Sequence, residues 1–289
     1  MEFLQLYYFN LVAKCEHMTS AAAQLHIAQP ALTQTIRRLE QELGVPLFDH
    51  EGRRIRLNQY GKILYQYSEQ ILQAVDNAKT EIDDVRQEAE RTVSAAFMAA
   101  SSLLPEIVEQ YYRKFPVIHL NIVQSLSGSG THGNEDMTIF SAAEDQVTSE
   151  AILLLKEPLL AALPSGHRMA CAASVALSDL KDESFISMGP ETSLGSMTVN
   201  YCRQAGFEPK IALMCENPAI FRELLAYNLG IALIPQKTWR MKDSSSFVLK
   251  PISDLKCNRY VCLKMHKGKY ESTAVRTLKD FLIQFFSKL

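Results

Sequence analysis

Long apolar runs are missing from this sequence. Two apolar segments, 151–155 and 159–163, are separated by Lys156 and Glu157, whereas a membrane-spanning helix needs roughly 20 consecutive apolar residues. The first residues lack the basic start of a secretory signal, and Gln5 interrupts their apolar stretch. We therefore expect a cytoplasmic protein that does not enter a membrane.

Patterned cysteines and histidines are also absent. The six cysteines show no CxxC spacing and are too sparse for a disulfide-stapled fold. Cys202 and Cys215 suggest a redox pair, but no basic cluster accompanies them to favour the thiolate, so buried free thiols are the favoured interpretation. The seven histidines include no HxH or HExxH pattern, which indicates no metal site. The sequence thus predicts no cofactor.

An excess of charge of either sign is lacking as well. The net charge is −2, from 30 basic and 32 acidic residues. The whole chain is not a polycation, so contact with a nucleic acid requires a local basic surface. Hydrophobic residues make up 47% of the chain, which is ample for a core, and a length of 289 residues suggests about two domains.

Three short helices are predicted near the N-terminus, over 3–13, 21–26 and 30–43. Thr19 and Ser20 are suitable N-terminal caps for the second helix. The third helix begins with a proline, which is tolerated in a first turn, and ends before a glycine. Its apolar positions recur every three or four residues and form one buried face. They are Leu32, Ile36, Leu39 and Leu43.

A hairpin and a long helix are predicted next. Basic and apolar residues alternate over 53–57, after Gly52, which predicts a hairpin with Arg54 and Arg56 on one face. From 58 to about 91 we expect one helix with a narrow apolar stripe, which is typical of a helix that pairs with another helix. Packing of this helix on its own domain is the alternative. The stripe consists of Leu64, Tyr67, Ile71, Ala74, Ala78, Ile82, Val85 and Ala89.

The polar side of the third helix carries side chains that suit base recognition. Gln bonds adenine, Arg bonds guanine, and Thr contacts bases or phosphates. Hydroxyls and free N–H groups at the start of the second helix suit a phosphate. A solvated face and an exposed basic turn are the alternative, which the coincidence of three features within about 60 residues disfavours. The candidate DNA-binding residues are Thr19, Ser20, Gln29, Pro30, Ala31, Thr33, Gln34, Arg37, Arg38, Arg53, Arg54 and Arg56.

The same residues carry a family resemblance. The pattern comprises Thr19-Ser20-Ala21-Ala22, Gln29-Pro30-Ala31-Leu32-Thr33-Gln34, Ile36-Arg37-Arg38-Leu39-Glu40, Glu42-Leu43-Gly44, Leu47-Phe48, Gly52-Arg53 and Gly61. It resembles the DNA-binding domain of LysR-type transcriptional regulators. The resemblance implies a winged helix-turn-helix over 1–58, a dimerising linker helix over 59–91 and an effector-binding domain over 92–289. Asn58 stands where the family usually has Thr and is an equally good N-terminal cap.

Beyond residue 92, short apolar runs alternate with helical stretches, which predicts α/β layering. Strands are expected over 92–97, 119–124, 137–142, 158–163, 184–188, 210–215, 231–234, 247–249 and 259–264. Helices are expected over 103–115, 196–205, 218–227 and 272–288. Segments 101–105, 163–170 and 225–235 resemble the family's effector domain more loosely. They imply a two-lobed fold like that of periplasmic binding proteins, with lobe I over 92–162 and 266–289 and lobe II over 163–265. Crossing strands are expected near 158–164 and 259–265.

A ligand is expected in the cleft at the strand ends of such a fold. Ser101 and Ser102 would start a helix, where an anion such as a carboxylate is favoured. Further candidates follow other strands, although each also fits as a cap or loop residue. The candidate effector-binding residues are Ser101, Ser102, Ser125, Ser127, Met188, Gly189 and Thr192. One departure from the family is the polar, glycine-rich segment 125–136, which is too short for the usual crossover helix.

The sequence therefore predicts an N-terminal winged helix-turn-helix, a linker helix and an α/β domain, in a regulator that is not an enzyme. The resemblance implies double-stranded promoter DNA, a small-molecule effector of anionic character and further copies of this chain as partners. A dimer through the linker helix and a homotetramer are implied, and RNA polymerase is a further candidate partner. The alternatives are a thiol-based or effector-independent regulator of the same family, or an enzyme or solute-binding module on a periplasmic-binding-like fold.

Overall fold

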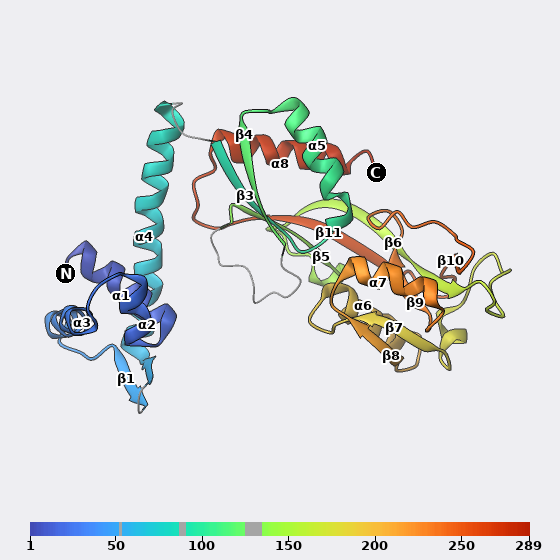
Figure 1. The fold of residues 1–289 in the computed structure, drawn as a ribbon, viewed down its shortest axis with the longest axis horizontal. Coiled ribbons are helices and arrows are strands. Elements are labelled where there is room, and N and C mark those ends of the chain that lie inside the picture. The colour runs from blue at the N-terminus through green and yellow to red at the C-terminus, as the bar shows by residue number, and fades with distance from the viewer. Residues whose placement is uncertain (52–53, 87–90, 125–134) are drawn as a thin grey trace. The chain divides into compact units, whose positions relative to one another are not determined.

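The computed structural model describes residues 1–51, 54–86, 91–124 and 135–289 (Figure 1). It divides into two compact units. The N-terminal unit comprises Met1–Glu88 with Gly268–Tyr270, and the C-terminal unit comprises Ala89–Lys267 with Glu271–Leu289. Three of the candidate site residues, Arg53, Ser125 and Ser127, lie outside the described residues, as do Gly52 of the family pattern and Ala89 of the predicted apolar stripe. Within the described residues, no helix combines the length and apolar character needed to cross a membrane.

Three helices build the core of the N-terminal unit. They are α1 (Phe3–Cys15), α2 (Met18–Gln24) and α3 (Gln29–Leu43), close to their predicted positions. α3 ends at Gly44, whose φ of 73° is a left-handed conformation that glycine adopts without steric cost. The inward faces of the three helices meet in one hydrophobic cluster, which includes Phe9, Val12, Ala21, Ala22, Leu32, Ile36 and Leu39.

Two details of these helices differ from the prediction. Thr19 and Ser20 are not the caps of α2, because the helix begins earlier and His17 caps it. The Nδ1 atom of His17 accepts a hydrogen bond of 3.3 Å from the backbone N–H of Ser20. Leu43 is 40% exposed rather than buried, because it lies in the last turn of α3, where the core formed with α1 and α2 has ended.

A short hairpin is attached to the helices by its apolar residues. β1 (Phe48–Glu51) pairs antiparallel with β2 (Arg54–Leu57). Phe48 and Ile55 are each 6% exposed and belong to the helical core. Arg56, the neighbour of Ile55, is exposed, as the predicted alternation of basic and apolar residues requires.

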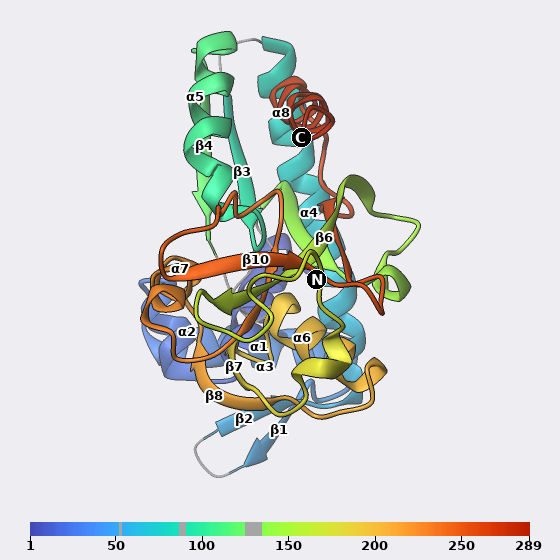
Figure 2. The same cartoon turned by 90° about the vertical axis from the view of Figure 1, so that its right-hand side faces the viewer.

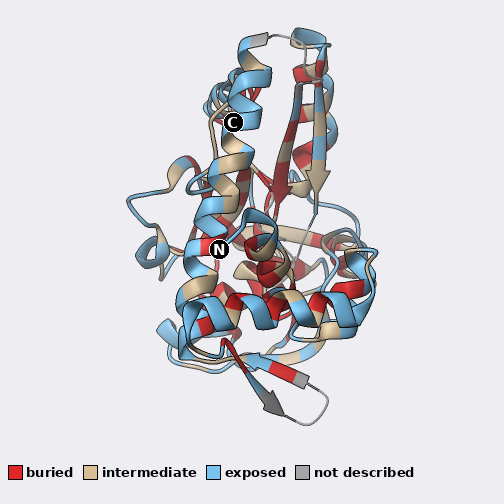
Figure 3. Ribbon diagram, turned by 90° about the vertical axis from the view of Figure 1, so that its left-hand side faces the viewer, coloured by how far each residue is buried: buried red, intermediate tan, exposed pale blue. Residues whose placement is uncertain are grey.

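α4 (Gln59–Arg86) is the predicted long helix. Asn58 caps its start, since its Oδ1 atom accepts hydrogen bonds of 2.9 Å from the N–H groups of Tyr60 and Gly61. A buried hydrogen bond of 2.9 Å from Asn10 Nδ2 to Ser68 Oγ joins α1 to α4. Figure 3 shows most of α4 as exposed or intermediate. Of the predicted apolar stripe, Leu64 packs on the core, whereas Tyr67, Ile71, Ile82 and Val85 are exposed in this single chain.

A mixed sheet is the frame of the C-terminal unit. Its order is β10 (Phe247–Pro251), β6 (Ile152–Pro164), β11 (Asn258–Met265), β5 (Met137–Ala142), β3 (Arg91–Phe97) and β4 (Ile118–Val123), and β9 (Ala232–Pro235) also pairs with β6. β4 and β5 lie on opposite sides of β3 and both run parallel to it. β7 (Ser184–Met188) and β8 (Lys210–Cys215) form a separate parallel pair.

Helices cover these sheets and enclose two cores. α5 (Leu104–Lys114) contacts α8 (Thr273–Phe286), and α8 lies along β3 (Figures 1 and 2). These helices close one core, and α6 (Ser193–Gln204) and α7 (Pro218–Leu224) close the other. β6 passes from one core to the other, with Leu155 in the first and Leu159 in the second.

Three predicted boundaries in this unit are wrong. α7 ends at Leu224 rather than at 227, because Leu225–Tyr227 form a tighter 3-10 turn. The other two errors concern the starts of β6 and α6. β6 begins at Ile152 rather than at 158, because Glu157 does not break the strand. Its Oε2 atom accepts hydrogen bonds of 2.8 Å from the N–H groups of Lys237 and Thr238, and its Oε1 atom accepts one of 2.7 Å from Thr238 Oγ1. α6 begins at residue 193 rather than at 196, because Thr192 caps it by accepting a 3.1 Å hydrogen bond from the N–H of Gly195.

Position 195 requires glycine because α6 approaches the end of β7 closely. A Cβ atom at Gly195 would lie 2.1 Å from the carbonyl oxygen of Gly189 and 2.5 Å from that of Met188. We predict that Gly195→Ala lowers the free energy of unfolding by about 1–3 kcal/mol, the range for an overpacked site, as measured by chemical denaturation. Gly166→Ala is the control, since nothing lies within 4 Å of its added Cβ. Equal losses in both variants would contradict this account.

Candidate nucleic-acid interface and ligand cavity

α3 presents a polar face opposite its buried one. Leu32, Ile36 and Leu39 are at most 2% exposed, and this fixes the rotation of the helix. A shallow depression on the opposite side is lined by Gln29, Pro30, Thr33, Gln34 and Arg37. All of these except the half-buried Thr33 are exposed. The predicted base-reading side chains therefore lie together on one surface of the N-terminal unit.

Gln29 and Thr33, one turn apart on this face, are joined by hydrogen bonds. Gln29 Nε2 donates a 3.1 Å hydrogen bond to Thr33 Oγ1, and that hydroxyl donates one of 3.0 Å to the carbonyl of Gln29. The amide oxygen of Gln29 remains available as an acceptor for a base or a water molecule. Arg37, one turn beyond Thr33, adds a guanidinium that matches the acceptor edge of guanine.

The other DNA-binding candidates differ in what the structure shows of them. Thr19, Ala31 and Arg38 are exposed, as is Arg56 on β2. The hydroxyl of Ser20 is also exposed but lies 3.2 Å from His17 Nδ1, so it already has a partner. The backbone of Arg54 lies in β2, two residues from Arg56.

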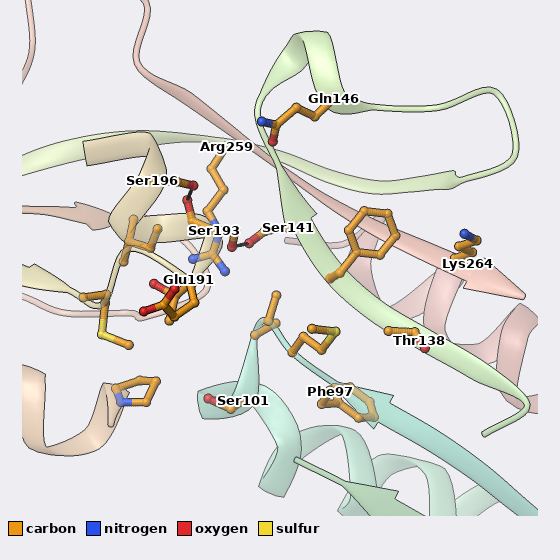
Figure 4. A pocket seen from close by; sticks show the side chains of 18 of the residues that line it. Phe97, Ser101, Thr138, Ser141, Gln146, Glu191, Ser193, Ser196, Arg259 and Lys264 are labelled. Atoms are coloured by element: carbon orange, nitrogen blue, oxygen red, sulfur yellow. Dashed lines mark hydrogen bonds between the residues drawn. The ribbon is translucent and has the colours of Figure 1, made fainter. Parts of the chain in front are cut away.

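A cavity of about 510 Å³ lies in the C-terminal unit, within the usual size range of small-molecule sites. Its walls come from both cores, from the ends of β3 and β7, from β5 and from the start of α6. Apolar side chains form much of the wall, among them Phe97, Phe140, Met188, Leu194 and Trp239. One group of polar side chains, Ser193, Ser196, Glu191 and Arg259, lies together in Figure 4, while Thr138, Gln146 and Lys264 line other parts of the wall.

Arg259 is the buried charge of this cavity. It is 4% exposed, and its Nε and Nη1 atoms have no hydrogen-bond partner in the part of the chain that the structure describes. Glu157 stands opposite it on β6, but the carboxylate of Glu157 accepts its hydrogen bonds from residues 237 and 238. Burial lowers the pKa of Arg259 and the charge of Glu157 opposes that shift, yet an arginine remains protonated at neutral pH.

The predicted effector residues are only partly brought together. Ser101, Met188 and Thr192 line the cavity. Ser102 instead donates a hydrogen bond from its hydroxyl to the carbonyl of Thr238. Gly189 is not among the residues that line the cavity. Its carbonyl accepts a 2.7 Å hydrogen bond from Thr192 Oγ1.

Arg259 and Ser193 belong to the cavity wall and were not predicted from the sequence. Arg259 opens the predicted strand 259–264, and a charge at a strand end usually indicates solvent exposure. The one available signal was a pair of opposite charges, with Arg259 at the start of one strand expected to cross and Glu157 directly before the other. Ser193 was missed because α6 was predicted to start three residues later.

Of the two cysteines suggested as a redox pair, Cys202 is a buried free thiol as predicted, whereas Cys215 is only half-buried. Burial raises the pKa of Cys202 to about 12 and that of Cys257 to about 12, and the charge of Cys257 adds to the shift at Cys202. Thiols with such pKa values are protonated at neutral pH and react slowly. The Sγ atom of Cys215 lies 3.4 Å from the carbonyl of Asn217. Among the described residues, no group of three or more His, Cys, Asp or Glu side chains could hold a metal ion.

Known proteins resemble both units. Residues 3–62 match the model of the lysR family of bacterial regulatory helix-turn-helix proteins, and residues 86–287 match that of the LysR substrate binding domain. Transcriptional dual regulator GltC of Bacillus subtilis (strain 168) is 30% identical over 296 residues, which cover 100% of this chain and 99% of GltC.

Solved structures share the fold. A full-length variant of OxyR from Pseudomonas aeruginosa has a TM-score of 0.68 at 20% identity, and the match covers 98% of this chain and 94% of the OxyR chain. Full-length CbnR in complex with its target DNA has a TM-score of 0.61 at 18% identity, with coverages of 98% and 99%. With a helix-turn-helix domain, a long helix and an effector-binding domain in this order, the chain belongs to the LysR family of bacterial transcriptional regulators.

Proposed function

We propose that this regulator acts in the cytoplasm and reads promoter DNA with the polar face of α3. The observation that carries the proposal is the division of α3 into two faces. One is at most 2% exposed at Leu32, Ile36 and Leu39, and the other presents Gln34 and Arg37 to solvent. An amphipathic second helix of a helix-turn-helix enters the major groove with such a polar face.

The remaining contacts in this proposal go to the DNA backbone. Arg56 on β2 neutralises a phosphate beside the groove, and Arg53 and Arg54 are expected from the sequence to do the same. Thr19 and Ser20 contact a phosphate near the start of α2. Backbone contacts of this kind fix the register of the protein on the duplex, while α3 supplies the sequence preference. CbnR, which shares this fold, has been solved in complex with its target DNA.

We further propose that α4 pairs with α4 of a second copy. Its exposed apolar residues recur at helical spacing over several turns, and a solvated helix does not need such a stripe. A dimer formed in this way carries two recognition helices and reads two half-sites. We also propose that two such dimers assemble into a homotetramer and that the regulator contacts RNA polymerase.

The small-molecule effector is proposed to bind in the cavity of the C-terminal unit.

Arg37→Ala tests the base-reading assignment. We predict a loss of about 1–3 kcal/mol in specific DNA binding, the range for one bidentate base contact, together with a relaxed preference at one base pair. Gel shifts on the intergenic DNA upstream of the gene, over a salt series, measure both effects. Arg203→Ala is the control, because Arg203 is an exposed arginine of α6 that pairs with Glu208. Unchanged affinity and preference in Arg37→Ala would refute the assignment.

Ile82→Glu tests the dimer. Ile82 is 57% exposed in the single chain, and a charge at this position would be buried between paired helices. We predict that the concentration at which the dimer dissociates rises at least about tenfold, since a lost Ile contact alone amounts to about 1.5–3 kcal/mol. Light scattering after size exclusion gives the mass. Gln66→Glu adds the same charge at an exposed position away from the stripe and should leave the dimer intact.

A further inference from the structure

We infer that the cavity recognises an organic carboxylate, held between Arg259 and the N-terminus of α6. The inference rests on the proposed regulatory function and specifies the chemical class of its effector. It differs from the sequence prediction, which placed the anion at Ser101 and Ser102 before α5. Three independent observations carry it. They are a buried guanidinium with two unpartnered nitrogen atoms, a helix N-terminus beside it, and a large share of apolar side chains in the rest of the wall.

The guanidinium is buried without the partners that burial normally demands. Arg259 is 4% exposed and two of its nitrogen atoms lack a hydrogen-bond partner among the described residues. Its cross-strand neighbour Glu157 has its own set of donors at 2.7–2.8 Å. Buried charged groups are normally paired and hydrogen-bonded because desolvation is costly. A guanidinium that lines a cavity in this state is matched by a ligand carboxylate, which accepts charge-assisted hydrogen bonds from it.

The start of α6 adds backbone donors at the same side of the cavity. Thr192 caps the helix through the N–H of Gly195, while a helix N-terminus offers further N–H groups and a favourable dipole for an anion. Ser193 in the first turn hydrogen-bonds the hydroxyl of Ser141 on β5. Figure 4 shows Ser193 and Ser196 beside Arg259. The close approach at Gly195 fixes this turn against the end of β7.

The rest of the wall indicates an organic ligand rather than an inorganic anion. Phe97, Phe140, Met188, Leu194 and Trp239 leave much of the cavity apolar. A volume of about 510 Å³ far exceeds that of a sulfate or phosphate ion, and apolar walls contribute affinity only when an apolar body covers them. One protein carboxylate, the exposed Glu191, also lines the cavity and repels a bound anion.

Fluorescence of the single tryptophan offers a readout at the site, because the chain's only Trp is Trp239 in the cavity wall. The full-length protein is titrated at constant ionic strength with acetate, butyrate and hexanoate, with butyramide as the neutral match and with sulfate. We expect carboxylates to bind and butyramide not to bind. Affinity should rise about fourfold per added methylene, the factor for burying one such group, and sulfate should bind more weakly than hexanoate.

Arg259→Gln should weaken hexanoate binding by about 10- to 100-fold, the range for hydrogen bonds to a charged group. Glu191→Gln should strengthen it, because the repelling charge is gone. Arg203→Gln is the control, since it removes an arginine from the far end of α6, where Arg203 pairs with Glu208, and should bind as the unmodified protein does. Thermal unfolding shows whether each variant is folded. The midpoint temperature of Arg259→Gln should be no lower than that of the unmodified protein, because the substitution removes a buried charge with unpartnered nitrogen atoms.

Three results would overturn the inference. They are equal hexanoate binding by Arg259→Gln and the unmodified protein, tighter binding of sulfate than of hexanoate, and no response to any carboxylate at concentrations up to about 100 mM, where even weak acids of millimolar affinity would saturate the site. If Arg259→Gln does not fold, three other comparisons still test the inference. They are the series from acetate to hexanoate, butyrate against butyramide, and hexanoate binding by Glu191→Gln. Gel shifts without ligand test DNA binding separately, so failure of the effector class is distinguishable from failure of the regulatory proposal.

Discussion

The passage of β6 from one hydrophobic core to the other, with β11 paired beside it, is the constraint on which the C-terminal unit depends. Each strand carries one buried charge at this point, Glu157 on β6 and Arg259 opposite it on β11. The protein satisfies the carboxylate completely with donors from residues 237 and 238. It leaves the guanidinium partly unsatisfied and places a cavity beside it. Glu157 on β6 is therefore a structural charge with its own donors, whereas Arg259 on β11 keeps donors that can bind a ligand.

In the N-terminal unit the corresponding constraint is the rotation of α3. The core residues Leu32, Ile36 and Leu39 admit one orientation of the helix, so the direction of Gln34 and Arg37 follows from packing. The hairpin is held to the same core through Ile55. The proposed recognition surface lies on a helix that the core has fixed, and such a surface loses less conformational entropy on binding than a surface on a free loop does.

The sequence predicts those features that depend on local patterns. The face of α3, the strands β5, β7 and β8 and the exposed stripe of α4 each follow from residue spacing within one element. Features that depend on distant partners were missed. The predicted strand 158–163 omitted Glu157, because the three donors that allow its burial lie about eighty residues away in the sequence. The burial of Arg259 depends on elements distant in the sequence, so the sequence analysis did not select it as a site residue. His17 was missed as a cap because histidine is not among the usual cap residues.

The placement of the cavity also explains how a ligand can act on this unit. A ligand shifts a conformational equilibrium only by its different affinity for the two states. Here the cavity walls come from both cores, with β3 and β5 on one side and β7 and α6 on the other. The hydrogen bond between Ser141 and Ser193 already joins these walls. A carboxylate bound by Arg259 and the first turn of α6 adds contacts on both sides, and it therefore favours the arrangement in which the two walls are close.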